Sequence, residues 1–531
     1  MSKVNQIEMR IESSASIQFN YMTFLKYFIF FSLVISGCKQ APRNEEQSKI
    51  VTEQHRPQIH FSPQANWMND PNGMVFFNNR YHLFYQYYPD STVWGPMHWG
   101  HASTTDLVNW EHHPVALYPD SLGYIFSGSA VADYNNTSGF GKNGVTPLVA
   151  IFTHHDPKAE KAGSNRFENQ SIAYSLDEGM TWTKYEGNPV LKNPGIKDFR
   201  DPKVSWYEPG EKWIMTLAVR DRISFYSSTD LKNWVKESEF GDGIGAHDGV
   251  WECPDLFSMD HNGRTIWVLL VSVGSGGPNG GSATQYFTGE FDGREFKAND
   301  STIKWVDYGP DNYAGVTWSN TADRRIFIGW MSNWQYANTV PTKKWRSAMT
   351  IPRELSLVNV GDQYHLVSNP VPELEALSQD AVNLENINVR DDYPLSGKIR
   401  NKQVVSRLEL QVEEIDDFSI LMTNRQHDSL VLGYDKMSNQ YFIDRQGSGD
   451  VGFHPEFARH HTAPRINKGK NAELVLITDN ASVELFADNG LTVMTAVFFP
   501  KEPLTDYTIR SAKGIIIKQL TYTGLKEAKI K

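Results

Sequence analysis

A short pattern that recurs along the chain is the feature that most constrains its fold. The string Ser-Thr-Thr-Asp-Leu-Val-Asn-Trp at 103–110 returns as Ser-Ser-Thr-Asp-Leu-Lys-Asn-Trp at 227–234, and a related string, Ser-Leu-Asp-Glu-Gly-Met-Thr-Trp, lies between them at 175–182. Each copy follows a segment rich in β-forming residues. A spacing of roughly 50–70 residues fits one four-stranded blade of a β-propeller, whereas chance similarity among the hairpin turns of a β-sandwich is the alternative.

The length of the chain predicts more than one folded unit. Its 531 residues exceed what a single hydrophobic core usually serves. Short strand patterns continue to the C-terminus, but Trp is absent beyond about residue 380, and a Pro-rich stretch at 369–373 precedes this change. We therefore predict an all-β protein with a propeller at 57–356, a linker at 357–380 and a β-sandwich at 381–531.

Composition and charge narrow the class of partner. The chain has 51 basic and 62 acidic residues, a net charge of −11, which disfavours nucleic acids and anionic lipid headgroups. Its 15 Trp and 23 Tyr favour a neutral sugar, because the C–H faces of sugar rings pack on aromatic rings. The histidines occur in close pairs without metal-ligand spacing, so we expect neither a metal nor a cofactor.

The N-terminal segment predicts export. Residues 27–37 form an apolar run after Lys26 that is too short to cross a bilayer and suits a secretory signal. It ends in Ile-Ser-Gly-Cys, which resembles a bacterial lipobox with Cys38 as the lipidated residue. We expect a lipoprotein signal at 1–37, with Met22 as an alternative start, and a polar tether at 38–56. The protein would then be lipid-anchored at the bacterial cell envelope, in the periplasm or on the surface. An ordinary signal peptide or an uncleaved anchor is the alternative.

Three acidic motifs each place a carboxylate close to a proline, with an aromatic residue upstream. They are Trp-Met-Asn-Asp-Pro-Asn-Gly at 67–73, Phe-Arg-Asp-Pro-Lys at 199–203 and Trp-Glu-Cys-Pro-Asp at 251–255. Proline fixes its own φ and restricts the residue before it, so we expect three tight turns. Ordinary surface loops have a similar composition, but turns on successive blades would meet at the central channel of a propeller.

Paired carboxylates are what a retaining glycosidase requires. One carboxylate is the nucleophile, and a carboxylic acid about 5–5.5 Å away donates a proton to the leaving oxygen. We expect backbone N–H groups of the first turn to keep Asp70 ionised, and partial burial to keep Glu252 protonated. Asp201 would be a third carboxylate, with its charge held by the adjacent Arg200.

The three motifs, in this order, resemble those of glycoside hydrolase family 32, the sucrose- and fructan-cleaving β-fructofuranosidases that include invertases, levanases and exo-inulinases. The resemblance covers 60–355 and, more weakly, 482–487. It implies a five-bladed β-propeller followed by a C-terminal β-sandwich. It also implies that Asp70 is the nucleophile, Asp201 the transition-state stabiliser and Glu252 the acid/base.

Further positions carry over from the same resemblance as candidate substrate contacts, although each aromatic among them could equally be a core residue of a blade. The candidates are Trp67, Asn69, Gln86, Trp94, Phe126, Ser127, Arg200 and Trp334. Cys253 matches a Cys common in the third motif. It would pack beside Glu252 or tune it, because a catalytic thiol would need a His partner that the sequence does not signal.

The resemblance implies an exported, retaining exo-β-fructosidase that releases fructose from levan, inulin or sucrose. An endo-acting fructan hydrolase or a fructosyltransferase would use the same site, and a non-catalytic fructan-binding lipoprotein would be expected to lack one of the three acids. The string at 175–182 looks like a sialidase Asp-box, but the arginine cluster of such an enzyme is not evident. The arabinan- and xylan-cleaving propellers invert configuration and would lack the Asn-Asp-Pro-Asn-Gly motif.

Overall fold

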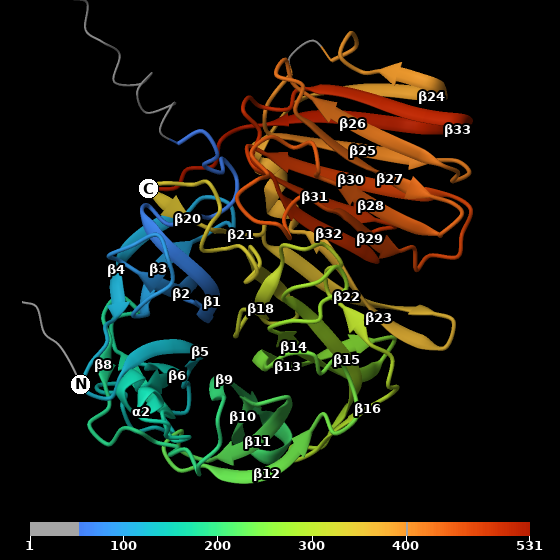
Figure 1. The fold of residues 1–531 in the computed structure, drawn as a ribbon. Coiled ribbons are helices and arrows are strands. Elements are labelled where there is room, and N and C mark those ends of the chain that lie inside the picture. Colours follow the sequence, from blue (N-terminus) through green and yellow to red (C-terminus); the bar gives the residue numbers. More distant parts are fainter. Residues whose placement is uncertain (1–52, 400–401) are drawn as a thin grey trace, which may run out of the picture. The chain divides into compact units, whose positions relative to one another are not determined.

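The computed structural model describes residues 53–399 and 402–531, which form five sheets of four or five strands and one sheet of ten. The five smaller sheets surround a central axis (Figure 1). The first blade contains β1 (Asn66–Phe77), β2 (Arg80–Tyr88), β3 (His98–Thr104) and β4 (Glu111–Leu117). The second contains β5 (Tyr124–Ala132), β6 (Leu148–His155), β7 (Glu168–Ser175) and β8 (Thr183–Lys184). The third contains β9 (Phe199–Tyr207), β10 (Lys212–Val219), β11 (Arg222–Ser228) and β12 (Val235–Phe240).

The last two blades follow the same plan with short additional strands. The fourth blade contains β13 (Trp251–His261), β14 (Arg264–Val273), β15 (Ala283–Phe291), β16 (Phe296–Ala298) and β17 (Lys304–Trp305). The fifth contains β18 (Tyr313–Thr317), β19 (Ile326–Met331), β21 (Ala348–Met349), β22 (Arg353–Val360) and β23 (Gln363–Pro370). The only helical segments between the strands of the ring are α2 (Pro157–Lys161) and the 3-10 turn η1 (Glu208–Gly210), within the described residues. The five-bladed propeller is confirmed.

The recurring sequence pattern occupies the same place in each of three blades. The copies connect β3 to β4, β7 to β8 and β11 to β12, where the Asp of each copy accepts hydrogen bonds from backbone N–H groups two to four residues ahead. The residue after that Asp has a left-handed φ in every copy. The fourth blade makes the same turn between β15 and β16 with Asp292 and Gly293, a copy too short to be recognised in the sequence. The repeat therefore marks the turn between the two outer strands in four of the five blades.

The ring is closed by a strand from the far end of the propeller. β20 (Trp345–Arg346) pairs in parallel with the start of β1 at Asn66 and Trp67. The Asn66 N–H also donates to the Lys344 carbonyl at 2.8 Å. Because this closure involves the first residues of β1, it holds the first acidic motif against the last blade.

The C-terminal region forms the predicted β-sandwich from one continuous sheet. Its strands are β24 (Ser378–Pro394), β25 (Ser406–Val412), β26 (Phe418–Thr423), β27 (Ser429–Asp435), β28 (Gln440–Asp444), β29 (His460–Pro464), β30 (Ala472–Asp479), β31 (Ser482–Ala487), β32 (Thr492–Val497) and β33 (Asp506–Leu525). The first residues of β33 pair with β26, and its later residues pair with β25. This change of partner lets the sheet curl around a large buried apolar cluster.

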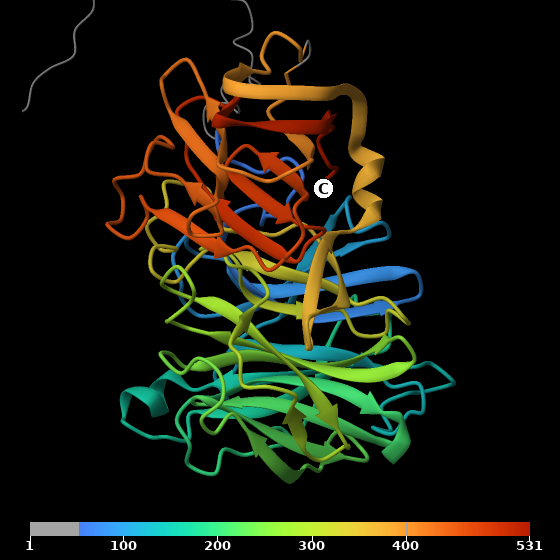
Figure 2. The same cartoon turned by 90° about the vertical axis from the view of Figure 1, so that its right-hand side faces the viewer.

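The stretch expected as a linker, 357–380, carries regular structure. It includes most of β22, all of β23 and the 3-10 helix η2 (Pro372–Leu377), which leads into the long strand β24 (Figure 2). β22 and β23 belong to the fifth blade, so the change from one hydrogen-bonded system to the other falls between Pro370 and Ser378. The division into domains at the expected boundaries stays a prediction. Within 53–399 and 402–531, no helix is long and apolar enough to span a membrane.

A buried cluster of charges joins residues of the propeller and the sandwich. The two ring nitrogens of His60 lie 2.8 Å from Asp479 Oδ2 and 2.8 Å from Glu484 Oε1. Arg353 bonds Glu484 through Nε at 3.0 Å and Asp307 through Nη1 at 2.9 Å. Burial alone lowers the pKa of His60, but its bonds to the two carboxylates outweigh burial and raise that pKa to about 9. Protonated His60 therefore stabilises the fold.

This cluster predicts a specific loss of stability at alkaline pH. Because the folded-state pKa of His60 lies above its unfolded value, its stabilising contribution is complete below about pH 6.5 and is lost as pH rises through about 9. The contribution is at most roughly 3 kcal/mol. We expect the thermal-unfolding midpoint of the wild type to fall between pH 6.5 and 9, and His60→Gln to lack that component. Equal pH dependence in both proteins would contradict the assignment.

Candidate active site

The three acidic motifs lie at the starts of innermost strands rather than in turns. They are in β1, β9 and β13, and each pairing with the next strand is interrupted at the motif by a β-bulge. Asp201 and Cys253 have left-handed φ values of 62° and 45°. The expectation of tight turns was therefore wrong. An innermost strand has a free edge toward the channel, which tolerates a proline without N–H, and a bulge redirects side chains without ending the strand.

A pocket of about 270 Å³ brings these motifs together. All three acids line it, although they come from the first, third and fourth blades. Of the eight candidate substrate contacts, the pocket includes Asn69, Gln86, Trp94, Phe126, Ser127, Arg200 and Trp334. The single exception is Trp67, which is 0% exposed. Cys38 lies outside the described residues.

Asp70 is held by side chains rather than by the backbone N–H groups expected from a turn. Ser127 Oγ donates to its Oδ2 at 2.7 Å, Asn69 Nδ2 donates to its Oδ1 at 2.9 Å, and the Cys253 thiol lies 3.5 Å from Oδ2. Burial raises the pKa of the Asp70 carboxyl, and the charge of Glu252 raises it further. The bonds from Ser127, Asn69 and Cys253 oppose this shift because they stabilise the ionised form. These three donors stabilise the ionised form of a buried carboxylate.

Asp201 accepts a hydrogen bond from the third motif, and its neighbour Arg200 acts on it through its positive charge, as expected from the sequence. The Cys253 N–H donates to Asp201 Oδ2 at 3.1 Å, and the Cys253 thiol lies 3.7 Å from the same oxygen. Burial raises the pKa of Asp201 well above its usual value; the positive charge of Arg200 opposes this, and the charges of Glu252 and Asp70 add to it. Cys253 therefore contacts Asp70 and Asp201, whereas the sequence predicted that it packs beside Glu252.

Glu252 is fixed by two partners. Arg200 donates from Nε at 3.1 Å and from Nη2 at 2.9 Å to Glu252 Oε1, and the Tyr313 hydroxyl donates to Oε2. Tyr313 begins the innermost strand of the fifth blade, so the acid of the fourth blade is held from both neighbouring blades. Burial raises the pKa of Tyr313 well above its ordinary value, and the adjacent Glu252 charge adds to this, so the phenol remains protonated as a donor.

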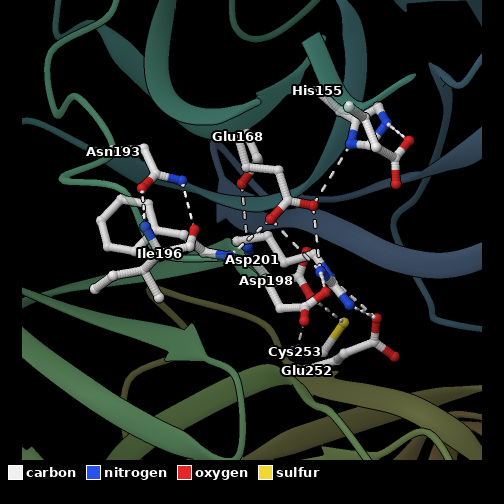
Figure 3. A network of polar contacts seen from close by, with 12 residues as sticks. His155, Glu168, Asn193, Ile196, Asp198, Asp201, Glu252 and Cys253 are labelled. Atoms are coloured by element: carbon white, nitrogen blue, oxygen red, sulfur yellow. Dashed lines mark hydrogen bonds and ion pairs between the residues drawn. The ribbon is translucent and has the colours of Figure 1, made fainter. Parts of the chain in front are cut away.

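A second group of carboxylates orients Arg200. Glu168 Oε1 and Asp198 Oδ1 accept from Arg200 Nη1 at 3.2 and 2.8 Å, and Glu168 also accepts the Phe199 N–H at 2.7 Å. Figure 3 shows Glu168, Asp198, Glu252 and Cys253 within one network of polar contacts. Burial alone raises the pKa of Glu168, but the charge of Arg200 and nearby donors lower it overall. Arg200 is thus an ion-pair bridge from Glu168 to Glu252.

Aromatic side chains form the wall and rim of the pocket. Trp334 stacks on the buried Trp67 at 5.9 Å, and the Trp67 indole N–H donates to Asn69 Oδ1 at 2.7 Å. Trp67 therefore supports Trp334 and Asn69 from behind and has no surface for a ligand. At the rim, Trp94 is 41% exposed and meets Phe126 edge-on at 6.1 Å.

One polar group in the pocket lacks a protein partner. Gln86 is buried, and in the described part of the chain its Nε2 donates no hydrogen bond. A buried donor left unpaired costs about 1–3 kcal/mol. A hydroxyl group of a ligand in this pocket would accept from it. The pocket thus combines three acids, an unpaired donor and aromatic walls, which is the equipment of a glycosidase.

Comparison with known proteins supports the same class. Residues 60–370 match the Glycosyl hydrolases family 32 N-terminal domain, and residues 373–529 match the Glycosyl hydrolases family 32 C terminal. The chain is 45% identical to a levanase of Bacillus subtilis over 519 residues, which cover 95% of this chain and 75% of the relative. It is 40% identical to an extracellular exo-inulinase of Aspergillus awamori over 500 residues, 87% of this chain and 92% of the relative.

Solved structures of similar proteins support the same class. The crystal structure of exo-inulinase from Aspergillus awamori matches with a TM-score of 0.82 at 37% identity, covering 89% of this chain and 98% of that one. A β-fructofuranosidase from Schwanniomyces occidentalis complexed with fructosyl-erythritol matches with a TM-score of 0.82 at 32% identity, covering 90% and 98%. The protein is a glycoside hydrolase. It belongs to glycoside hydrolase family 32, as its acidic motifs predicted.

Tyr313, Glu168 and Asp198 were not predicted from the sequence. Tyr313 lies in Asp-Asn-Tyr-Ala-Gly at 311–315, where an aromatic at a strand start has no distinguishing signal. Asp198 could have been noticed, because it directly precedes the second acidic motif. Glu168 comes from a different blade and carries no motif.

The environment of Asp70 predicts the pH dependence of activity. The Ser127 hydroxyl lowers the pKa of Asp70 by donating to its ionised form, so Ser127→Ala raises that pKa. We expect the acidic limb of kcat/KM to move to higher pH in this variant. The alkaline limb should stay in place, because Ser127 does not contact Glu252 in the described structure. An acidic limb at the wild-type position would show that the bond does not control Asp70.

Proposed function

We propose that the protein is a retaining exo-β-fructosidase that releases fructose from the ends of fructan chains, with sucrose as a smaller substrate. The observation that carries the proposal is the convergence of Asp70, Asp201 and Glu252 from separate blades beside the unpaired Gln86 donor. The levanase and exo-inulinase relatives supply the substrate class. A pocket of about 270 Å³ favours one terminal sugar unit over a long chain segment.

In the mechanism that we propose, Asp70 attacks the anomeric carbon C2 of the terminal fructosyl unit. Glu252 protonates the departing glycosidic oxygen, so that bond breaks as the C2–Asp70 bond forms. Glu252 then removes a proton from water, which attacks C2 and releases fructose and the Asp70 carboxylate. Asp201 bonds sugar hydroxyls, and these bonds strengthen as positive charge develops at the ring. Arg200 and Tyr313 orient Glu252 throughout.

The substrate proposal is tested by the products. We expect purified protein incubated with levan, inulin and sucrose to release fructose as the only early product from the polymers, because a single-unit pocket accepts chain ends. Chromatography that resolves products by chain length measures this. A ladder of oligosaccharides would indicate endo action, longer chains formed from sucrose would indicate transfer, and no release from any of the three would overturn the proposal.

The role of Glu252 is tested by replacement and rescue. Glu252→Ala removes the proton donor and should lower kcat on sucrose by roughly 10²–10⁴-fold with folding intact. With β-D-fructofuranosyl fluoride, whose fluoride leaves without acid, azide should restore part of the turnover because it attacks C2 without a general base. Near-wild-type turnover on sucrose would contradict the acid/base assignment.

We further propose that the protein is exported and anchored at the bacterial envelope through a lipid on Cys38. The extracellular exo-inulinase relatives support export, and the lipobox-like sequence supports the anchor. Cys38→Ala should move activity from the membrane fraction to the soluble fraction, while Cys253→Ala should not. An unchanged membrane fraction in Cys38→Ala would contradict the anchor.

A further inference from the structure

A second cavity lies at the opposite end of the propeller channel. The innermost strands β5, β9 and β13 each begin at the catalytic pocket, and later residues of each strand line this second cavity, which has a volume of about 600 Å³. Figure 1 shows these strands around the central axis. Ser258 lies six residues after Glu252, a separation of roughly 20 Å along a strand. The two cavities therefore open at different ends of the ring.

A buried ion pair forms the floor of this far cavity and divides it from the catalytic pocket. Lys203 Nζ bonds Asp255 Oδ2 at 3.1 Å and the Thr317 carbonyl at 2.6 Å, and the Thr317 N–H and hydroxyl bond the same Asp255 oxygen at 2.6 and 2.8 Å. Lys203 and Asp255 are the last residues of the second and third acidic motifs. The pair thus occupies the channel just beyond the acids.

One oxygen of this floor is left without a partner. Asp255 is 1% exposed and lines the far cavity, yet among residues 53–399 and 402–531 its Oδ1 accepts no hydrogen bond. A buried carboxylate oxygen without a donor is costly. A hydroxyl group of a ligand in the cavity would supply the donor. The catalytic mechanism makes no use of this oxygen.

The walls of the far cavity are rich in tryptophan. Trp206, Trp213, Trp267 and Trp318 all line it, four of the 15 Trp of the chain. The indole N–H groups of Trp206 and Trp213 are engaged by Glu208 at 2.6 Å and Thr137 at 2.8 Å. Trp213 and Trp318 are buried, at 4% and 2% exposed, so the ring surfaces that remain for packing are those of the half-buried Trp206 and Trp267. Tyr134, 61% exposed, also lines the cavity.

These features select a class of ligand. Lys203 neutralises Asp255, and Arg325 lines the same cavity, where its Nε donates to the Ser258 carbonyl at 3.1 Å. The ion pair of Lys203 with Asp255 leaves no net charge at the floor to attract an ion, and a purely apolar ligand would leave the unpaired oxygen without a donor. A neutral ligand with hydroxyl groups and apolar C–H faces would donate a hydrogen bond to the unpaired oxygen at the floor and pack on the aromatic walls. The volume is within the range of small-ligand sites, about 300–1,000 Å³.

We propose that the far cavity is a second, non-catalytic saccharide-binding site that takes a fructosyl segment of a fructan chain. The choice of fructan rests on the proposed function, whereas the saccharide chemistry rests on the cavity itself. A protein that binds a polymer at one face while it cleaves chain ends at the other raises the local concentration of chain ends near its catalytic pocket. Sucrose is too small to engage both sites, so its hydrolysis does not depend on the far cavity.

The test measures binding in full-length protein that does not turn over. Glu252→Ala protein is titrated calorimetrically with a β-2,1-linked and a β-2,6-linked fructan tetrasaccharide. We expect two sites per chain for at least one of them. Adding Trp206→Ala, or the exposed Tyr134→Ala if the first variant does not fold, should weaken the second site by about fivefold or more, since an aromatic contact contributes roughly 1 kcal/mol. A single site, or two sites unchanged by both variants, would overturn the proposal.

A matched control separates loss of the site from general damage. Tyr118 is 56% exposed and does not line either cavity, so Tyr118→Ala should keep both binding sites. In the otherwise wild-type enzyme, Trp206→Ala should lower kcat/KM on polymeric fructan and leave kcat/KM on sucrose within about twofold. Equal losses on both substrates would contradict a separate binding site. Failure of the wild type to release fructose would instead overturn the proposed function, because the titration does not depend on turnover.

Discussion

The inner edge of the propeller blades, which is free of a neighbouring strand at the three acidic motifs, is the constraint on which the catalytic pocket depends. The edge of an innermost strand faces the channel, so a proline there loses no ladder hydrogen bond, and Pro71, Pro202 and Pro254 all lie in such strands. The bulges at these points allow the left-handed φ of Asp201 and Cys253. Side chains that regular strands would direct elsewhere therefore meet in one pocket, and contacts between blades hold them there.

The same strands serve two ends of one channel. Their first residues supply acids to the catalytic pocket, and their later residues line the far cavity together with residues of β10 and β14. The Lys203–Asp255 ion pair lies between the two cavities, and its opposite charges cancel. Closure of the ring by β20 and the buried cluster around His60 and Arg353 connect this channel to the rest of the described chain.

The sequence alone predicted those features whose hydrogen bonds form between residues close together in the chain. The repeated Asp turns predicted the blades because each Asp accepts its hydrogen bonds within four residues, and the fourth copy was missed because Asp292 and Gly293 keep the turn with little of the pattern. Tyr313 and Glu168 were missed because their roles arise from contacts between blades. Proline and glycine are typical of tight turns and of bulged strands alike, so the sequence cannot distinguish the two. The pairing of β1 with β2 in the structure identifies the first motif as part of a bulged strand.

The central claim is that Asp70 becomes covalently bound to the sugar, and peptide mass spectrometry tests it most directly. Glu252→Ala protein would be mixed with β-D-fructofuranosyl fluoride, quenched and digested. Because fluoride leaves without acid while release of the sugar needs the missing base, the intermediate should accumulate. We predict that the peptide containing Asp70 gains the mass of one fructosyl unit. Release of fluoride without an adduct, or with an adduct on another carboxylate, would contradict the account.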